Sequence, residues 1–183
     1  MKRIAIVIGH TAAAPGARAV QGFYEYEFNT EIAKYMVGEL AKNVNLLPTI
    51  WTRDHMTIKG TYKRLQAFRP DIGVELHFNS FNTVANGCEM LHLNGSTASK
   101  RLAQCFQDAV LDLAHQYNYF LQDRGLKSIS KGDRGYTSLI GLNCPQIITE
   151  PCFGDNHNDS RILNHPHHLA LTYVKAINAY FSL

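Results

Sequence analysis

The sequence predicts a single α/β domain spanning residues 1–183, with a mainly parallel sheet flanked by helices on both faces. Two observations support this prediction. First, short apolar, β-branched runs alternate with amphipathic helical repeats along the whole chain, an order typical of parallel sheets covered by helices. Second, 183 residues are enough for one buried core but few for two, and no internal repeat, low-complexity tract or linker divides the chain.

The first part of the chain predicts two strands and a helix. Residues 2–8 are rich in β-branched side chains and stop at Gly9-His10, which indicates a buried strand. A flexible loop follows at 11–22. Apolar side chains then recur at helical spacing over about four turns, and residues 46–52 predict a second strand. The expected buried stripe of the helix is Phe28, Ile32, Tyr35, Met36, Leu40 and Val44.

The middle of the chain predicts a short helix between strands. Residues 62–68 have an amphipathic pattern that ends before Pro70, as helices commonly do near a proline. Residues 71–77 then predict a third strand, and residues 87–93 a fourth.

The last part of the chain predicts two longer helices around one strand. Ser96 is placed to cap the first of them. Residues 146–150, with the apolar pair Ile147-Ile148, predict a strand directly after Pro145, and the final helix is expected to start near Pro166, a favoured first-turn position. The buried stripe expected in the first helix is Leu102, Cys105, Phe106, Ala109, Val110, Leu113 and Tyr117; that of the last helix is Leu169, Tyr173, Ile177 and Phe181.

Composition describes an ordinary globular protein and excludes several classes. Apolar residues make up 45% of the chain and charged residues 18%. The formal net charge of +3 favours an anionic partner, but the basic residues are scattered without a binding motif, so no nucleic acid is expected. No apolar stretch approaches the about 20 residues of a transmembrane segment, and no signal peptide is recognised. The four cysteines form no Cys-x-x-Cys pair, which excludes a zinc knuckle and a redox motif.

Groups that bind metals or move protons follow three predicted strands: His10, His77 and Glu150. The carboxyl ends of parallel strands meet at one edge, where sites of α/β proteins gather. A catalytic zinc needs about three protein ligands from histidine and carboxylate. The two histidines supply two ligands. Glu25 and Glu27 both return to this edge, and their positions do not decide which is the third.

Four motifs occur together and in order: Val7-Ile-Gly-His10, Glu25-Tyr-Glu-Phe-Asn29, Glu75-Leu-His-Phe-Asn79-Ser and Pro145-Gln-Ile-Ile-Thr-Glu150. Together they resemble the amidase 3 family of zinc-dependent N-acetylmuramoyl-L-alanine amidases, over nearly the whole chain. One departure lies in the first motif, where many relatives have Asp-Pro-Gly-His-Gly-Gly and this chain has Val-Ile-Gly-His-Thr-Ala. The short 11–22 loop and the Glu-Tyr-Glu-Phe-Asn motif are similar to the phage endolysin branch.

The resemblance implies a site and a reaction. It makes Glu25, four residues before Asn29, the third ligand of one Zn²⁺ beside His10 and His77. It also makes Glu150 catalytic and places Asn79 in the substrate cleft. The implied reaction is hydrolysis of the amide between N-acetylmuramic acid and L-alanine of peptidoglycan. Zinc would activate water and polarise the carbonyl, while Glu150 moves protons.

The sequence is compatible with several interpretations of the biological role. A phage or prophage lysin is expected, made in the cytoplasm and reaching the wall through a holin or a secretion system. An interbacterial toxin or a host wall-remodelling enzyme would share the site. A zinc exopeptidase of related architecture and an inactive peptidoglycan-binding module are the alternative functions. The preferred type of peptidoglycan and the oligomeric state do not follow from the sequence.

For the other reactive residues, an ordinary structural role is weighed against a functional one. Glu75 lies on the strand face of His77 and could bond to that ligand or simply make a buried polar contact. Cys152 lacks a matched partner for nucleophilic catalysis, and Arg124 reads equally as a substrate contact or a salt-bridged loop residue. The histidines His165, His167 and His168 lack a carboxylate frame and are expected to form a solvated helix entry.

Overall fold

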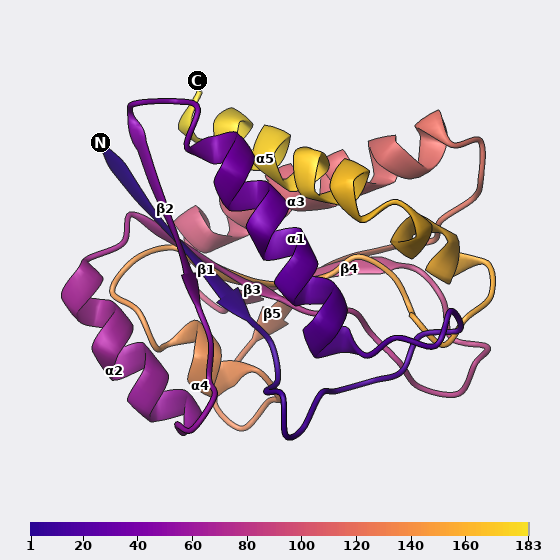
Figure 1. Cartoon of the computed structure of the whole chain (residues 1–183), viewed down its shortest axis with the longest axis horizontal. Helices are drawn as coiled ribbons and strands as arrows, with labels where there is room; N and C mark the ends of the chain where they lie inside the picture. The colour runs from indigo at the N-terminus through magenta and orange to yellow at the C-terminus, as the bar shows by residue number, and fades with distance from the viewer. Residues whose placement is uncertain (183) are drawn as a thin grey trace.

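Six strands form one sheet at the centre of the protein (Figure 1). The structure, a computed structural model, describes residues 1–182. The sheet order is β2-β1-β3-β6-β4-β5, and all neighbours are parallel except the antiparallel pair β4 and β6. The predicted mainly parallel sheet is therefore confirmed. The strands are β1 (Lys2–Ile8), β2 (Leu46–Trp51), β3 (Ile72–Leu76), β4 (Cys88–Leu93), β5 (Asp123–Ile129) and β6 (Gln146–Glu150).

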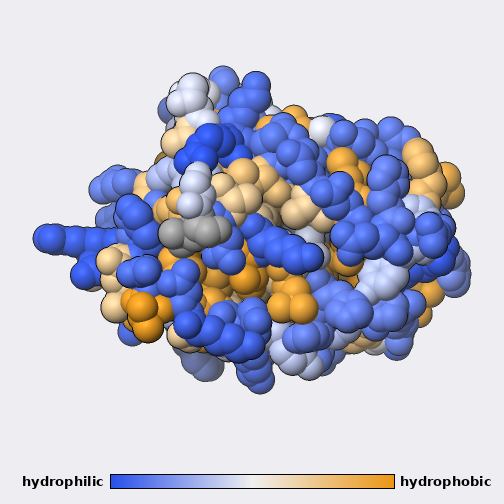
Figure 2. Space-filling model, turned by 90° about the horizontal axis from the view of Figure 1, so that it is seen from above, coloured by the Kyte–Doolittle hydropathy of each residue, from blue (hydrophilic) through white to orange (hydrophobic). Residues whose placement is uncertain are grey.

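Helices cover both faces of this sheet, as predicted. Three long helices pack together on one face: α1 (Glu25–Leu40), α3 (Thr97–Gln116) and α5 (Pro166–Phe181). The shorter helices α2 (Ile58–Phe68) and α4 (Tyr136–Leu139) contact each other on the opposite face. The view from the side of the long helices is mainly hydrophilic, with smaller apolar patches (Figure 2). Within residues 1–182, no helix combines the length and apolarity that crossing a bilayer requires.

The core has two parts because the strands are buried on both faces. Ile4, Ile6 and Ile8 of β1 point into the larger cluster, under the three long helices. The alternate residues Ala5 and Val7 point into a smaller cluster under α2. This arrangement explains why β1 reads as a continuous apolar run without polar alternation.

The structure corrects the expected start and buried stripe of α1. The helix begins at Glu25, three residues before Phe28, and is followed by a turn that leaves Val44 80% exposed. Tyr35 is 40% exposed, so it does not belong to the buried stripe either. The earlier start has a consequence for the site, because it places Glu25 in the first turn of a helix that packs against the sheet.

Three short elements were not predicted: β5, α4 and a 3-10 helix at Asp159–Asn164. β5 has the sequence DRGLKSI and is an edge strand with no fully buried position. It therefore lacks the apolar alternation by which strands are recognised. The other two elements contain four and six residues, too few for a helical period to show.

Candidate active site

The strand ends bring the expected residues to one edge of the sheet. His10 lies just past β1, His77 just past β3, and Glu150 ends β6. β1, β3 and β6 are adjacent and parallel, so their carboxyl ends meet. Glu25 is the first residue of α1 and approaches the same edge from the face of the long helices.

Glu25 lies between the two histidines and presents one carboxylate oxygen to each. Its Oε2 is 3.1 Å from His10 Nε2, and its Oε1 is 2.8 Å from His77 Nδ1. One ligand atom from each of the three residues lies within 4.8 Å of the others, and this is the one such group found among residues 1–182. The histidines at the start of α5 form no comparable group there. His165 and His168 instead stack with Tyr117.

The two candidate carboxylates of α1 have different surroundings. Glu25 is buried, and its two oxygens also accept backbone N–H groups from Phe78, at 3.2 Å, and from Ala17, at 3.1 Å. Glu27 is exposed and accepts the N–H of Tyr24 at 3.1 Å, which caps the start of the helix. The geometry therefore favours Glu25 as the carboxylate of a metal site and gives Glu27 a helix-capping contact.

The charges of this cluster are strongly coupled. Burial opposes ionisation of Glu25, but hydrogen bonds from His10 and His77 outweigh it and hold the pKa of Glu25 below its usual value. Burial likewise opposes protonation of His77, yet contacts with Glu25 and Glu75 raise its pKa. Glu150 differs because burial dominates and raises its pKa to about 8, assisted by Glu25 and Glu89.

Two glycines let the backbone pass close to the cluster. A Cβ on Gly9 would lie 2.4 Å from the imidazole of His77. A Cβ on Gly16 would lie 2.7 Å from both Glu25 Oε2 and the ring of His10, and Gly16 also has a φ of 83°. The loop after β1 therefore wraps the site closely, and Gly16 is required there by conformation and by space.

A buried polar network, which the sequence did not predict, contacts His77 at Nε2, the ring nitrogen that does not face Glu25. Glu75 Oε1 lies 3.0 Å from His77 Nε2 and 3.5 Å from Nη1 of Arg53. Tyr62 donates its hydroxyl hydrogen to Glu75 and accepts a hydrogen bond of 2.5 Å from Gln146. The period-two spacing of Glu75 and His77 left open a contact between them, but nothing in the sequence pointed to Arg53 or Tyr62.

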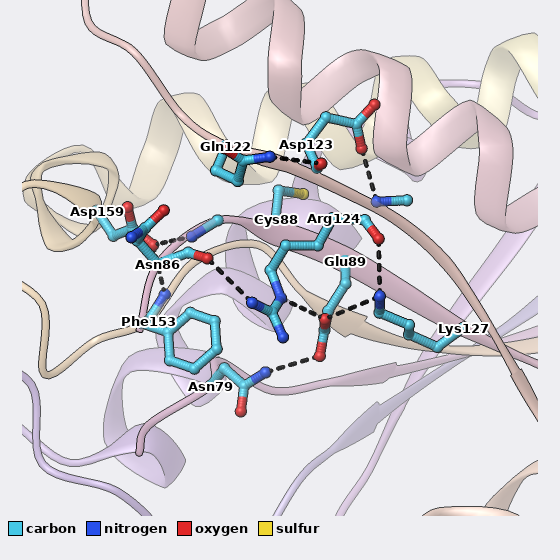
Figure 3. A network of polar contacts seen from close by, with 12 residues as sticks. Asn79, Asn86, Cys88, Glu89, Gln122, Asp123, Arg124, Lys127, Phe153 and Asp159 are labelled. Carbon is cyan, nitrogen blue, oxygen red and sulfur yellow. Dashed lines mark hydrogen bonds and ion pairs between the residues drawn. The ribbon is translucent and has the colours of Figure 1, made fainter. Parts of the chain in front are cut away.

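The cluster opens into a cavity of about 470 Å³ on the face of α2 and α4. Glu150 lines this cavity, and its Oε2 is buried without a hydrogen-bond partner within residues 1–182. Asn79 lines it as well and donates a hydrogen bond of 2.9 Å to Glu89 (Figure 3). The cavity thus combines a possible metal site, a carboxyl group with a raised pKa and a hydrogen-bonding wall.

The structure also gives the contacts of Arg124 and the surroundings of Cys152. Arg124 belongs to β5, not to a loop, and its Nε lies 2.6 Å from Glu89 (Figure 3). Its guanidinium lies over the ring of Phe153. Cys152 is a free, buried thiol whose pKa is raised by burial, which is the opposite of an activated nucleophile.

Comparisons with known proteins find relatives of this chain by family and by fold. A family model described as N-acetylmuramoyl-L-alanine amidase matches residues 4–179. No match was found among curated proteins. Among solved structures, the catalytic domain of CwlV, an N-acetylmuramoyl-L-alanine amidase from Bacillus (Paenibacillus) polymyxa var. colistinus, has a TM-score of 0.84 at 21% identity, covering 100% of this chain and 99% of that one.

Two further structures have the same fold. The N-acetylmuramoyl-L-alanine amidase of Clostridium difficile 630 has a TM-score of 0.84 at 22% identity, with 99% of this chain and 97% of that chain covered. The catalytic domain of the CD27L endolysin, which targets Clostridia difficile, has a TM-score of 0.79 at 18% identity, with 100% and 98% covered.

Proposed function

The chain belongs to the N-acetylmuramoyl-L-alanine amidase family, and from that premise we propose that it is a zinc-dependent lysin. Membership makes it an enzyme that acts on peptidoglycan. The proposal adds three points: the metal is zinc, one ion per chain; His10, Glu25 and His77 hold it; and Glu150 is the catalytic proton carrier. The bond cut is the amide between N-acetylmuramic acid and L-alanine.

The chemistry of the donor set supports zinc. Two imidazoles and one carboxylate form the kind of set that binds catalytic zinc and leaves a coordination position open. His10 Nε2 is buried and lies 3.1 Å from Glu25 Oε2, so the two ligand atoms sit side by side as they would around a shared metal ion. The three ligand atoms already lie within 4.8 Å of one another.

Each residue then has one role in the hydrolysis. Zinc held in this site supplies a Lewis acid that polarises the scissile carbonyl and lowers the pKa of water toward about 7. Glu150 accepts a proton as the water oxygen adds to the carbonyl carbon, and donates it to the nitrogen as the C–N bond breaks. Burial raises the pKa of Glu150 to about 8 although the charges of His77 and Arg134 oppose the rise, and a pKa this close to neutral suits proton exchange. Asn79 lines the cleft beside the substrate.

The lysin role is supported by two likenesses. The chain resembles the endolysin branch in its short 11–22 loop and its Glu25-Tyr-Glu-Phe-Asn29 motif. Its fold also matches the catalytic domain of an endolysin over its full length. A zinc exopeptidase remains the alternative reaction, and an inactive binding module the alternative function.

Mass spectrometry of digested peptidoglycan tests the reaction. We expect free stem peptides that begin with L-alanine and glycan strands without peptide. Excess chelator should abolish activity after long equilibration, and added zinc should restore it. Cleavage within the stem peptide would instead indicate an exopeptidase, and full activity in chelator would reject the metal. Binding without any turnover would favour the binding module.

A further inference from the structure

A second hollow of about 430 Å³ adjoins the catalytic cavity beyond Glu150. The two hollows share Glu89, Leu91 and Arg134 in their walls, so they lie side by side, and together they are called the groove. The strand register explains its direction. Leu91 of β4 is paired with Ile148 of β6 on one side and with Lys127 of β5 on the other. Paired residues point to the same face, so this row carries the groove from the catalytic centre to the edge strand.

The far end of the groove carries the cation Lys127, whose nearest carboxylate, Glu89, is already bonded to other side chains. Glu89 already accepts hydrogen bonds from Arg124 and Asn79 (Figure 3). Lys127 lies farther from the same carboxylate, at 3.7 Å, and its side chain is 40% exposed. Lys127 Nζ also donates a hydrogen bond of 2.7 Å to the carbonyl of Arg124 (Figure 3). An ammonium group has three donors, so Lys127 can still bind another anion.

Arg134 lies where the two hollows meet, in the turn between β5 and α4. Among residues 1–182 its guanidinium makes no ion pair or hydrogen bond, although its charge is close enough to Glu150 to oppose the rise of that group's pKa. The adjacent Asp133 carboxylate accepts the N–H of Ser130 in its own turn. The exposed guanidinium of Arg134, in the shared wall of the two hollows, is therefore free to bind a ligand through a planar set of donors that matches a carboxylate.

We propose that the groove beyond Glu150 is the subsite for the stem peptide, and that Arg134 and Lys127 bind a carboxylate of that peptide. This inference rests on the proposed function. In the substrate, the carboxyl group of muramic acid forms the scissile amide, so the free carboxylates belong to the peptide half. The substrate accordingly lies with its peptide over β4 and β5 and its sugar at the other end of the cavity.

The reach of the groove limits which carboxylate is bound. Two strand spacings separate β6 from β5, about 10 Å in all. Three fully extended residues span at most about 10 Å. The carboxylate therefore belongs to one of the first three residues after the scissile amide. Amidation of the stem peptide at these positions should then make a poorer substrate, so the groove selects among peptidoglycan types.

The test compares N-acetylmuramoyl tripeptides whose peptide carboxylates are either free or amidated. For the wild type we expect kcat/KM to be about 10–100-fold higher with the free carboxylates, mainly through KM. In Arg134→Gln this ratio should fall toward one, and in Lys127→Gln it should fall in part. Lys131→Gln is the matched control, because Lys131 is exposed in the same turn and lines neither hollow. An unchanged ratio in Arg134→Gln would overturn the proposal.

A binding measurement separates this proposal from the proposed function. The Kd values of the free and amidated product peptides, measured by calorimetry, should differ in the same ratio for the wild type and converge in Arg134→Gln. If the wild type hydrolyses neither substrate but discriminates between the peptides, the function is wrong and the subsite stands. Hydrolysis of both substrates at equal rates, with equal Kd values, would reject the subsite alone.

Discussion

Glu75 and His77 are joined through Nε2 of the imidazole, at 3.0 Å, while Nδ1 of the same ring faces Glu25 at 2.8 Å. One nitrogen is thus held by a buried carboxylate and the other is turned toward the candidate metal site. A carboxylate on the far nitrogen of a metal-binding histidine fixes the ring and increases its basicity, and removing such a partner commonly lowers metal affinity about 10–100-fold.

We therefore predict that Glu75→Gln weakens zinc binding by about 10–100-fold. Competition with a chromophoric chelator measures this directly, without reference to activity. Glu39→Gln is the control, since Glu39 is partly exposed on the far end of α1 and pairs with Lys42. Because Glu75 is fully buried, the melting temperature of each variant without zinc should be measured as well. Wild-type zinc affinity in folded Glu75→Gln protein would contradict the prediction.

The pair Glu25→Ala and Glu27→Ala tests the choice of carboxylate. Glu25→Ala should lose most of its bound zinc, because a buried oxygen contact to each histidine disappears. Glu27→Ala should keep its zinc and lose about 1 kcal/mol of stability or less, the size of a helix-capping contribution. Metal analysis of the purified variants and urea unfolding measure the two effects. The reverse pattern of zinc loss would make Glu27 the ligand.

Gly16→Ala should disturb the site without removing a ligand. A Cβ at this position would lie 2.7 Å from Glu25 Oε2 and from the ring of His10, so the ligands must shift. Gly132→Ala is the matched control: Gly132 also has a positive φ, of 104°, but a Cβ there meets nothing within 4 Å. Both variants should lose about 1 kcal/mol through backbone strain, and only Gly16→Ala should also lose zinc affinity. Equal zinc affinity in the two variants would show that the loop can move away.

The sequence predicted the sheet and the site residues because their signals are local. β1 contains a continuous apolar run and β6 the apolar pair Ile147-Ile148. His10 and His77 lie just past β1 and β3, Glu150 ends β6, and the ends of these adjacent parallel strands must meet. The choice of Glu25 over Glu27 depended on the resemblance, since the decisive contacts come from Ala17 and Phe78, which a helical pattern does not contain.

What the sequence did not predict depends on packing between distant segments. The support of Glu75 comes from Arg53, after β2, and from Tyr62, inside α2. β5 gave no apolar signal because it is an edge strand with partly exposed residues. The groove toward Lys127 could not be predicted either, because its course depends on the pairing of β4 with β5.

The stability of the zinc-free protein should reveal the raised pKa of Glu150. Its pKa is about 8 in the folded protein, against 4.5 for a glutamate free in water. Between these values the unfolded chain binds fewer protons at this group, so its contribution to stability falls as pH rises from 4.5 to 8. His77 also loses its contribution at higher pH, so the wild type must be compared with Glu150→Gln. We expect urea midpoints to shift in favour of the Gln variant from pH 5 to pH 8; a constant difference would contradict the raised pKa.

The last prediction separates catalysis by Glu150 from metal binding. Glu150→Gln keeps the shape of the side chain and removes its capacity to carry a proton. Because Glu150 is not part of the three-residue group around Glu25, zinc content should stay near that of the wild type. Activity should fall about 10²–10⁴-fold, the usual contribution of general acid–base catalysis, with peptidoglycan binding retained. His10→Ala is the contrasting variant, which should lose zinc together with activity.

The three possible outcomes for Glu150→Gln therefore have distinct meanings. Retained zinc with retained activity would remove Glu150 from the mechanism, although Glu150 lines the cavity and its buried Oε2 lacks a hydrogen-bond partner in residues 1–182. Loss of zinc with loss of activity would make Glu150 a ligand instead of a proton carrier. Retained zinc and binding with a large loss of turnover is the result the geometry predicts, because a carboxyl group kept free of partners beside the metal site is available to exchange protons with the reacting atoms.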